Sequence, residues 1–169
     1  MSDRGGRSAG VDADLFRDAM ARWAATVTVI AARDADDGRV RATTATSFAP
    51  VSAEPPEVVV SLSPGAQVLP FIEEGGFVGI SLLSADQRRW ARLFADSYPV
   101  GPSPWPDEGV PLLPGALAGL TCSVQAIHPT EGRSRLVVVR LEEVALGDAT
   151  EPLLYGNRTY RVLTPEDGG

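Results

Sequence analysis

Short runs of β-branched and aliphatic residues recur along most of the chain and predict strands. They occupy residues 26–31, 39–44, 58–62, 77–83, 117–127, 136–146, 153–155 and 159–163. Residues 34–38 and 156–157 are rich in Asp, Gly and Asn, which favour tight hairpin turns. Short connections favour antiparallel pairing, and about eight strands in one small domain favour closure of the sheet. The pattern therefore predicts a mainly β protein built on a closed antiparallel barrel.

Three other segments carry the spacing or the capping signals of helices. Phe16, Met20 and Trp23 follow at i, i+4 and i+7 after two aspartates that can cap a helix. We expect this helix to pack its apolar face on the core. Residues 67–74 predict a short helix ended by two glycines. Residues 84–94 open with a capping-box pattern and predict a third helix.

The remaining segments define loops and ends. Residues 99–114 contain six prolines, so they can form neither a regular helix nor a central strand. A loop of this length is more often functional than not. Residues 1–11 are small, polar and Gly-rich and are expected to be a disordered tail, and residues 165–169 a second tail. Residues 12–164 then form one domain.

Composition excludes several classes of function. The net charge is -7, which disfavours a general nucleic-acid binder and an anionic membrane surface. All 15 basic residues are Arg, so lysine cannot form a Schiff base or act as a general base. A single Cys122 and a single His128 argue against disulfides and against a zinc site. We expect a cytoplasmic protein, because the chain has neither an apolar span nor a signal-like N-terminus.

The candidate chemistry lies in hydroxyl side chains at strand ends. Residues 43–47 are mostly Thr and Ser and follow one strand, and Ser61 and Ser63 end the next. Beside exposed backbone N–H groups, such residues suit a phosphate or the edge of a polar heterocycle, and the helix expected from Gln67 would favour an anion. The same residues also suit plain solvated turns. The chain contains no P-loop, no Gly-x-Gly-x-x-Gly and no Gly-x-Ser-x-Gly motif.

Five stretches, taken together and in order, carry a family resemblance. They are residues 16–29, 44–56 (with Thr44-Ala45-Thr46-Ser47-Phe48 and Pro55-Pro56), 79–87, 114–122 and 153–161. In these stretches the chain resembles the flavin reductase-like family, which has the FMN-binding split-barrel fold and includes the reductase components of two-component flavin-dependent monooxygenases. The resemblance implies an antiparallel split β-barrel with flanking helices and a homodimer. It also implies binding of FMN, or FAD, reduction by NADH or NADPH, and delivery of reduced flavin to a partner monooxygenase.

Site residues follow from the same resemblance, position by position. Thr44, Ala45, Thr46 and Ser47 would hold the edge of the isoalloxazine ring through backbone and hydroxyl groups. Ser61, Leu62, Ser63 and Gln67 would hold the ribityl chain and the phosphate. Arg133, Ser134 and Tyr160 are the candidates for nicotinamide binding. Because the flavin carries the hydride chemistry, catalysis would consist chiefly of positioning and charge stabilisation, and no catalytic acid or base is assigned.

The chain departs from the family pattern at three places. Thr46 stands where the family usually has Asn, Gly132-Arg133-Ser134 stands where many members have Gly-Asp-His, and the Lys-Phe pair after the third helix is absent. These departures leave two alternatives to a reductase: a flavin-binding protein without turnover, and a barrel that now binds another small molecule. Trp105, in the proline-rich segment, either shields a flavin face or packs under its own loop.

Overall fold

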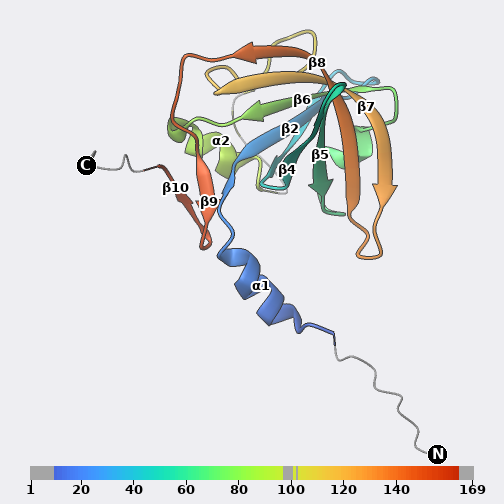
Figure 1. Ribbon diagram of the computed structural model, residues 1–169. Helices are drawn as coiled ribbons and strands as arrows, with labels where there is room; N and C mark the ends of the chain where they lie inside the picture. Colours follow the sequence, from blue (N-terminus) through green and yellow to red (C-terminus); the bar gives the residue numbers. More distant parts are fainter. Residues whose placement is uncertain (1–9, 97–100, 102, 164–169) are drawn as a thin grey trace, which may run out of the picture.

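The computed structural model describes residues 10–96, 101 and 103–163. The expected tails at residues 1–11 and 165–169 lie outside these residues, apart from Gly10 and Val11. The described chain contains ten strands and two α-helices (Figure 1). The elements are α1 (Ala13–Ala21), β1 (Ala25–Thr26), β2 (Thr28–Arg33), β3 (Val40–Ala45), β4 (Phe48–Ala53), β5 (Pro56–Leu62), β6 (Phe77–Leu82), α2 (Arg88–Leu93), β7 (Ala118–Pro129), β8 (Arg135–Leu146), β9 (Leu154–Gly156) and β10 (Thr159–Arg161), with 3-10 turns η1 (Leu69–Phe71) and η2 (Ala85–Gln87).

Seven strands form the main antiparallel sheet, in the order β3-β2-β6-β7-β8-β5-β4. A small sheet of β1, β9 and β10 lies beside it. The predicted mainly β split barrel with flanking helices is confirmed. The expectation of full closure is wrong, because β3 and β4 are the edge strands and no strand ladder joins them in the described chain. The barrel is therefore split where the chain passes from β3 to β4.

Strand β2 shows how the sequence builds two cores. Its residues are buried on both faces, which explains why it reads as a continuous apolar run rather than an alternating one. Ile30 and Ala32 face the main core inside the barrel. Val29 and Ala31 face a second cluster, which also contains Phe94 of the α2 C-cap and Leu113 of the proline-rich segment. This second cluster joins α2 and that segment to the outer side of the sheet.

Strand β4 was missed by the sequence pattern. It pairs with β5, but its last five residues are all exposed, and Pro50 lies within it. An edge strand tolerates proline because one side of its backbone has no partner strand. Without burial on either face, the segment shows no apolar alternation that could have revealed it.

The helix expected at residues 67–74 is reduced to the 3-10 turn η1. Pro70 fits the first turn of a helix, but the chain is already extended at Ile72, with φ -104° and ψ 121°. The anion-binding helix start expected at Gln67 is therefore wrong. The helix expected at residues 84–94 is confirmed as η2 followed by α2, and the Ser84 N–H donates to the Gln87 side chain as the capping-box pattern predicts.

Helix α1 begins after Asp12, whose side chain accepts the N–H groups of Asp14 and Leu15 as its cap. The expectation that this helix packs on the core of its own chain is wrong. None of its residues is buried, and it extends away from both sheets (Figure 1). Phe16 and Met20 remain more than half exposed, and Trp23, just beyond the helix, is 70% exposed. Periodicity identifies an apolar face, but it does not say what covers that face.

Candidate functional site

The predicted hydroxyl segments meet at the split of the barrel. The Ser47 hydroxyl donates to the Ser61 carbonyl at 2.6 Å and accepts the Ser61 N–H at 3.2 Å. The neighbouring residues Phe48 and Val60 continue this contact as a strand pair of β4 and β5. We call residues 44–47 the corner. The corner and the end of β5 therefore form one continuous edge, as the sequence analysis required.

Thr44 belongs to the support of this edge. Its hydroxyl donates to the Ala91 carbonyl at 2.8 Å, and its backbone N–H donates to the Phe94 carbonyl at 3.0 Å. Both acceptors lie in the last turn of α2, where carbonyls have no partner within a helix. Thr44 thus caps α2 and has no donor left for a ligand. Ser47 is similarly engaged by β5, so the hydroxyls at both ends of the corner hold its shape.

Three predicted side chains remain available for a ligand. The Thr46 and Ser63 side chains are exposed, and Gln67 is half-buried. Within the described ranges, these three side chains form no hydrogen bond with the protein. Leu62 is buried in the main core, and Ala45 is nearly so. Their side chains therefore shape the wall, and only their backbones could contact a bound molecule.

A cavity of about 210 Å³ opens beside the corner. It is lined by Val27, Thr44, Ala45, Thr46, Ala95, Tyr155 and Tyr160. Tyr155 and Tyr160 are cross-strand partners in the β9–β10 hairpin, and their rings meet edge to face at 5.2 Å. Burial raises the pKa of Tyr160, and the neighbouring Tyr155 adds to the rise, so its phenol stays protonated at neutral pH. The sequence analysis missed Tyr155; the signal was its position opposite Tyr160 across a two-residue turn.

Arg133 and Ser134 lie on another side of the corner, in the turn between β7 and β8. Register places them there, because Leu62 pairs with Arg135 at the start of β8. The Arg133 backbone has φ +65°, a left-handed value uncommon for a residue with a side chain, and its N–H donates to the Thr130 carbonyl at 2.9 Å. The Arg133 side chain is exposed. The Arg133 turn thus adjoins the end of β5, whereas Tyr160 lines the cavity beside the corner from the β9–β10 hairpin.

Other chemistry is weakly supported in the described part of the chain. The described residues contain no group of three or more His, Cys, Asp or Glu side chains placed to hold a metal ion. Burial, with a smaller contribution from Glu142, raises the pKa of the Cys122 thiol to about 12, so it is not a nucleophile at neutral pH. Among the described helices, none has the length and hydropathy needed to cross a bilayer.

Comparison with known proteins agrees with this geometry. Residues 20–164 match the family described as "Flavin reductase like domain". The reductase component of 4-hydroxyphenylacetate 3-monooxygenase from Thermus thermophilus is 40% identical over 154 residues, covering 89% of this chain and 96% of the relative. An NADH-dependent flavin reductase from a Rhodococcus species is 37% identical over 156 residues, covering 88% and 85%.

Solved structures show the same fold. The flavin reductase of styrene monooxygenase from Pseudomonas putida S12 superposes with a TM-score of 0.79 at 28% identity, covering 89% of this chain and 98% of the other. The flavin reductase PheA2 gives a TM-score of 0.80 at 29% identity, covering 92% and 100%. The family match spans both the corner and the β9–β10 hairpin, and the resemblance stated from the motifs is confirmed: the chain belongs to the flavin reductase-like family.

Proposed function

We propose that this protein is an NAD(P)H-dependent flavin reductase that reduces FMN and supplies the reduced flavin to a partner monooxygenase. The observation that carries the proposal is the edge formed by the corner and the end of β5, next to a cavity with aromatic walls. Relatives named as flavin reductases, or as reductase components of monooxygenases, share nearly the full length of the chain. FAD is the alternative flavin.

The residues present fit a flavin. FMN combines a planar ring system that has a polar edge with a flexible chain ending in phosphate. The ring edge suits the Thr46 hydroxyl and the backbone of the corner, while the ribityl chain and phosphate suit Ser63, Gln67 and the backbone between them. When bound, the flavin accepts a hydride from the nicotinamide and carries the electrons to the oxygenase. The protein supplies the surface that holds the two ring systems against each other.

The nicotinamide is assigned to the side of the cavity that Tyr155 and Tyr160 form. The two phenol rings give an aromatic wall against which a planar ring can pack. Arg133 is exposed and cationic, which suits the pyrophosphate of a dinucleotide. NADH is the expected donor, because several relatives are named for it.

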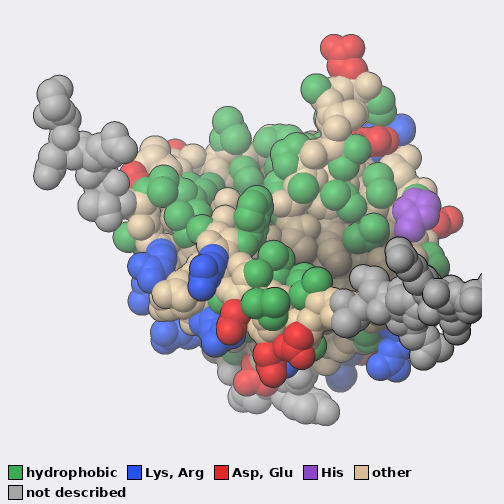
Figure 2. Space-filling view, turned by 60° about the horizontal axis from the view of Figure 1, so that its bottom comes forward, with side chains coloured by type: hydrophobic (Ala, Val, Ile, Leu, Met, Phe, Trp, Pro, Cys, Tyr) green, Lys and Arg blue, Asp and Glu red, His purple; other side chains and the backbone are tan. Residues whose placement is uncertain are grey.

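We also infer that the chain acts as a homodimer in the cytoplasm, where reduced nicotinamides are available. An isolated helix of nine residues is marginal in water, so α1 needs a cover that the described part of its own chain does not give. Hydrophobic side chains spread across the side of the molecule shown in Figure 2. The direction of α1 is fixed, because Asp18 pairs with Arg158 at 2.7 Å and the Asn157 N–H donates to the Ala21 carbonyl. A second copy is the occupant we assign to its apolar face.

Turnover is tested by mixing the purified protein with FMN and NADH and following the loss of the NADH absorbance band. We expect oxidation well above the rate without protein. No oxidation with either NADH or NADPH, and with either FMN or FAD, would refute the proposal. The substituted Gly132-Arg133-Ser134 turn favours one rival, a flavin-binding protein without turnover, which would gain thermal stability with FMN but oxidise no NADH.

Dimerisation is tested by light scattering on Phe16→Glu and on the matched exposed variant Arg22→Glu. We expect a dimer for the unmodified chain and for Arg22→Glu, and dissociation for Phe16→Glu, because a buried unpaired carboxylate is costly. A monomeric unmodified chain at micromolar concentration would overturn the assignment of the second copy to α1.

A further inference from the structure

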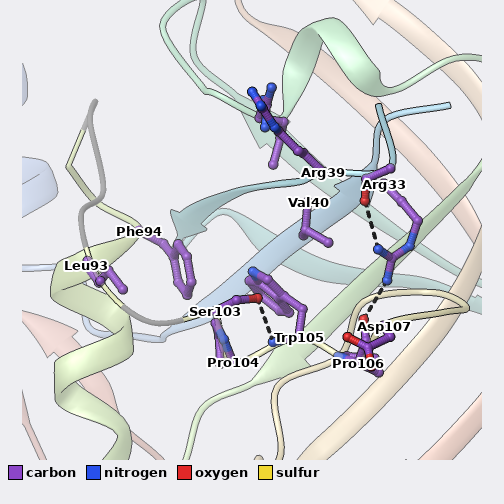
Figure 3. A pocket seen from close by; sticks show the side chains of 13 residues that line it. Arg33, Arg39, Val40, Leu93, Phe94, Ser103, Pro104, Trp105, Pro106 and Asp107 are labelled. Carbon is purple, nitrogen blue, oxygen red and sulfur yellow. Dashed lines mark hydrogen bonds between the residues drawn. The ribbon is translucent and has the colours of Figure 1, made fainter. Parts of the chain in front are cut away.

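The proline-rich segment is fastened to the hairpin of β2 and β3 by one arginine. The Arg33 guanidinium donates to the carbonyl of Pro106 at 2.7 Å (Figure 3), of Gly109 at 3.2 Å and of Gly38 at 2.9 Å. Two of these acceptors belong to the segment and one to the hairpin. A guanidinium holds its donors in a rigid plane, so three simultaneous contacts fix the segment relative to the sheet. We call residues 103–114 the proline loop.

The fastened loop places Trp105 against α2. The Trp105 ring lies 5.1 Å from the Phe94 ring, and the Trp105 N–H donates to the Ser103 hydroxyl at 3.4 Å (Figure 3). The Phe94 ring also stacks with the Trp90 ring, with 6.1 Å between the centroids. Trp105 is half-buried in the second cluster and does not line the cavity beside the corner. Of the two roles considered for Trp105, the structure shows packing under the loop.

Phe94 connects this packing to the corner. Its ring packs against both Trp90 and Trp105, while its carbonyl accepts the backbone N–H of Thr44. The position of the carbonyl therefore depends on how the ring is packed. Thr44 is in turn the first residue of the corner, and its two donors are both committed to α2. A shift of Phe94 would release the N–H of Thr44 and loosen the segment that follows it.

We propose that Trp105 is a positioning residue for flavin binding, which sets the corner through Phe94 and Thr44 and is itself held by Arg33. This inference rests on the proposed function, because it assigns a role to Trp105 toward the flavin. Trp105 itself does not line the cavity beside the corner. Its effect is conveyed by a side-chain packing contact and one backbone hydrogen bond.

The first test follows the Thr44 amide directly, in the flavin-free protein, by hydrogen exchange measured with NMR. In Trp105→Ala we expect the Thr44 amide to exchange at least about fivefold faster, which corresponds to the loss of about 1 kcal/mol, the typical contribution of one hydrogen bond. The Ile30 amide at the centre of β2 serves as the internal reference and should keep its protection. Trp105→Phe retains an aromatic ring against Phe94 and should restore most of the protection of Thr44.

The second test measures the affinity for FMN by calorimetry, without NADH. We expect Kd to rise about tenfold in Trp105→Ala and to stay within about twofold of the unmodified value in Trp105→Phe. Arg33→Met removes the two hydrogen bonds to the loop and the one to the hairpin without touching the aromatic rings. It should weaken FMN binding in the same direction, and it keeps the inference testable if Trp105→Ala does not fold.

The matched control is Val124→Ala, which removes buried volume from the main core, away from α2. It should lower thermal stability but leave both Thr44 exchange and FMN affinity unchanged. Equal effects in Val124→Ala would mean that general destabilisation is responsible, and unchanged values in both Trp105→Ala and Arg33→Met would also overturn the inference. If the unmodified protein fails to bind FMN, the proposed function fails instead, and Thr44 exchange still reports on the packing.

Discussion

Gly79, in the middle of β6, lies directly under the proline loop. A Cβ atom at this position would stand 2.0 Å from the Pro111 carbonyl oxygen. Because this oxygen belongs to the backbone, it cannot move away by a change of rotamer, as the end of a flexible side chain can. To reach an ordinary contact of 3.4 Å, the loop would have to move by 1.4 Å, the difference between the two distances. Gly79→Ala therefore tests how closely the loop is seated on the sheet.

The free-energy cost of that movement follows from the hydrogen bond and the buried side chain that the loop contributes at Leu113, two residues after Pro111. The Leu113 N–H donates to the Ser81 hydroxyl at 2.9 Å, and Ser81 is almost fully buried. Losing this bond would leave two buried polar groups without partners, at about 1–3 kcal/mol. Partial exposure of the buried Leu113 side chain would cost up to about 3 kcal/mol more. We expect Gly79→Ala to lower the free energy of unfolding by about 1–6 kcal/mol, the sum of these two contributions.

Urea unfolding followed by circular dichroism measures the change, with Gly65→Ala as the matched control. Gly65 has nothing within 4 Å of its added Cβ and no unusual backbone angle, so that variant should stay within about 1 kcal/mol of the unmodified chain. Should Gly79→Ala unfold at the same urea concentration as Gly65→Ala, the close approach of the loop to β6 would be wrong. The support that we assign to Trp105 would then also lose its basis.

Three further outcomes are expected. Thr46→Val should leave thermal stability unchanged, because the hydroxyl has no hydrogen-bond partner among the described residues, but should weaken FMN binding about fivefold to tenfold in calorimetry. Cys122 makes the fold sensitive to alkali: its thiol ionises near pH 9 when unfolded and near pH 12 when folded, so its contribution is complete below pH 9. Stability should then fall by about 1.4 kcal/mol per pH unit above pH 9, and denaturant titrations of Cys122→Ala should show a shallower fall. Tyr160→Phe keeps the edge-to-face ring pair and should leave KM for NADH within about twofold, whereas Tyr160→Ala should raise it in steady-state assays.

The edge strand and the first helix show where sequence patterns stop being informative. β4 carries Pro50 and no apolar alternation, so nothing local distinguishes it from a loop; only its pairing with β5 makes it a strand. In α1 the apolar spacing correctly predicted a helix with one apolar face, but the prediction that this face packs on the core of the same chain was wrong. Asp18 and Ala21 are bound by the β9–β10 hairpin, nearly the whole chain length away, and this directs the helix outward.

The sequence by itself determined the strands that bury at least one face, the capping box at Ser84 and the hairpin turns, because each rests on residues near one another in the chain. It also determined the family, because the motifs keep their order along the chain. The sequence also indicated that the hydroxyl residues of the corner are candidates for ligand binding. Only the tertiary structure decided how those hydroxyls are used. Thr44 and Ser47 are committed to α2 and β5, while Thr46 is left free, because a side chain's partner depends on which distant segment folds against it. Tyr155 and Trp105 follow the same rule: their chemistry is visible in the sequence, but their place relative to the site is set by long-range packing.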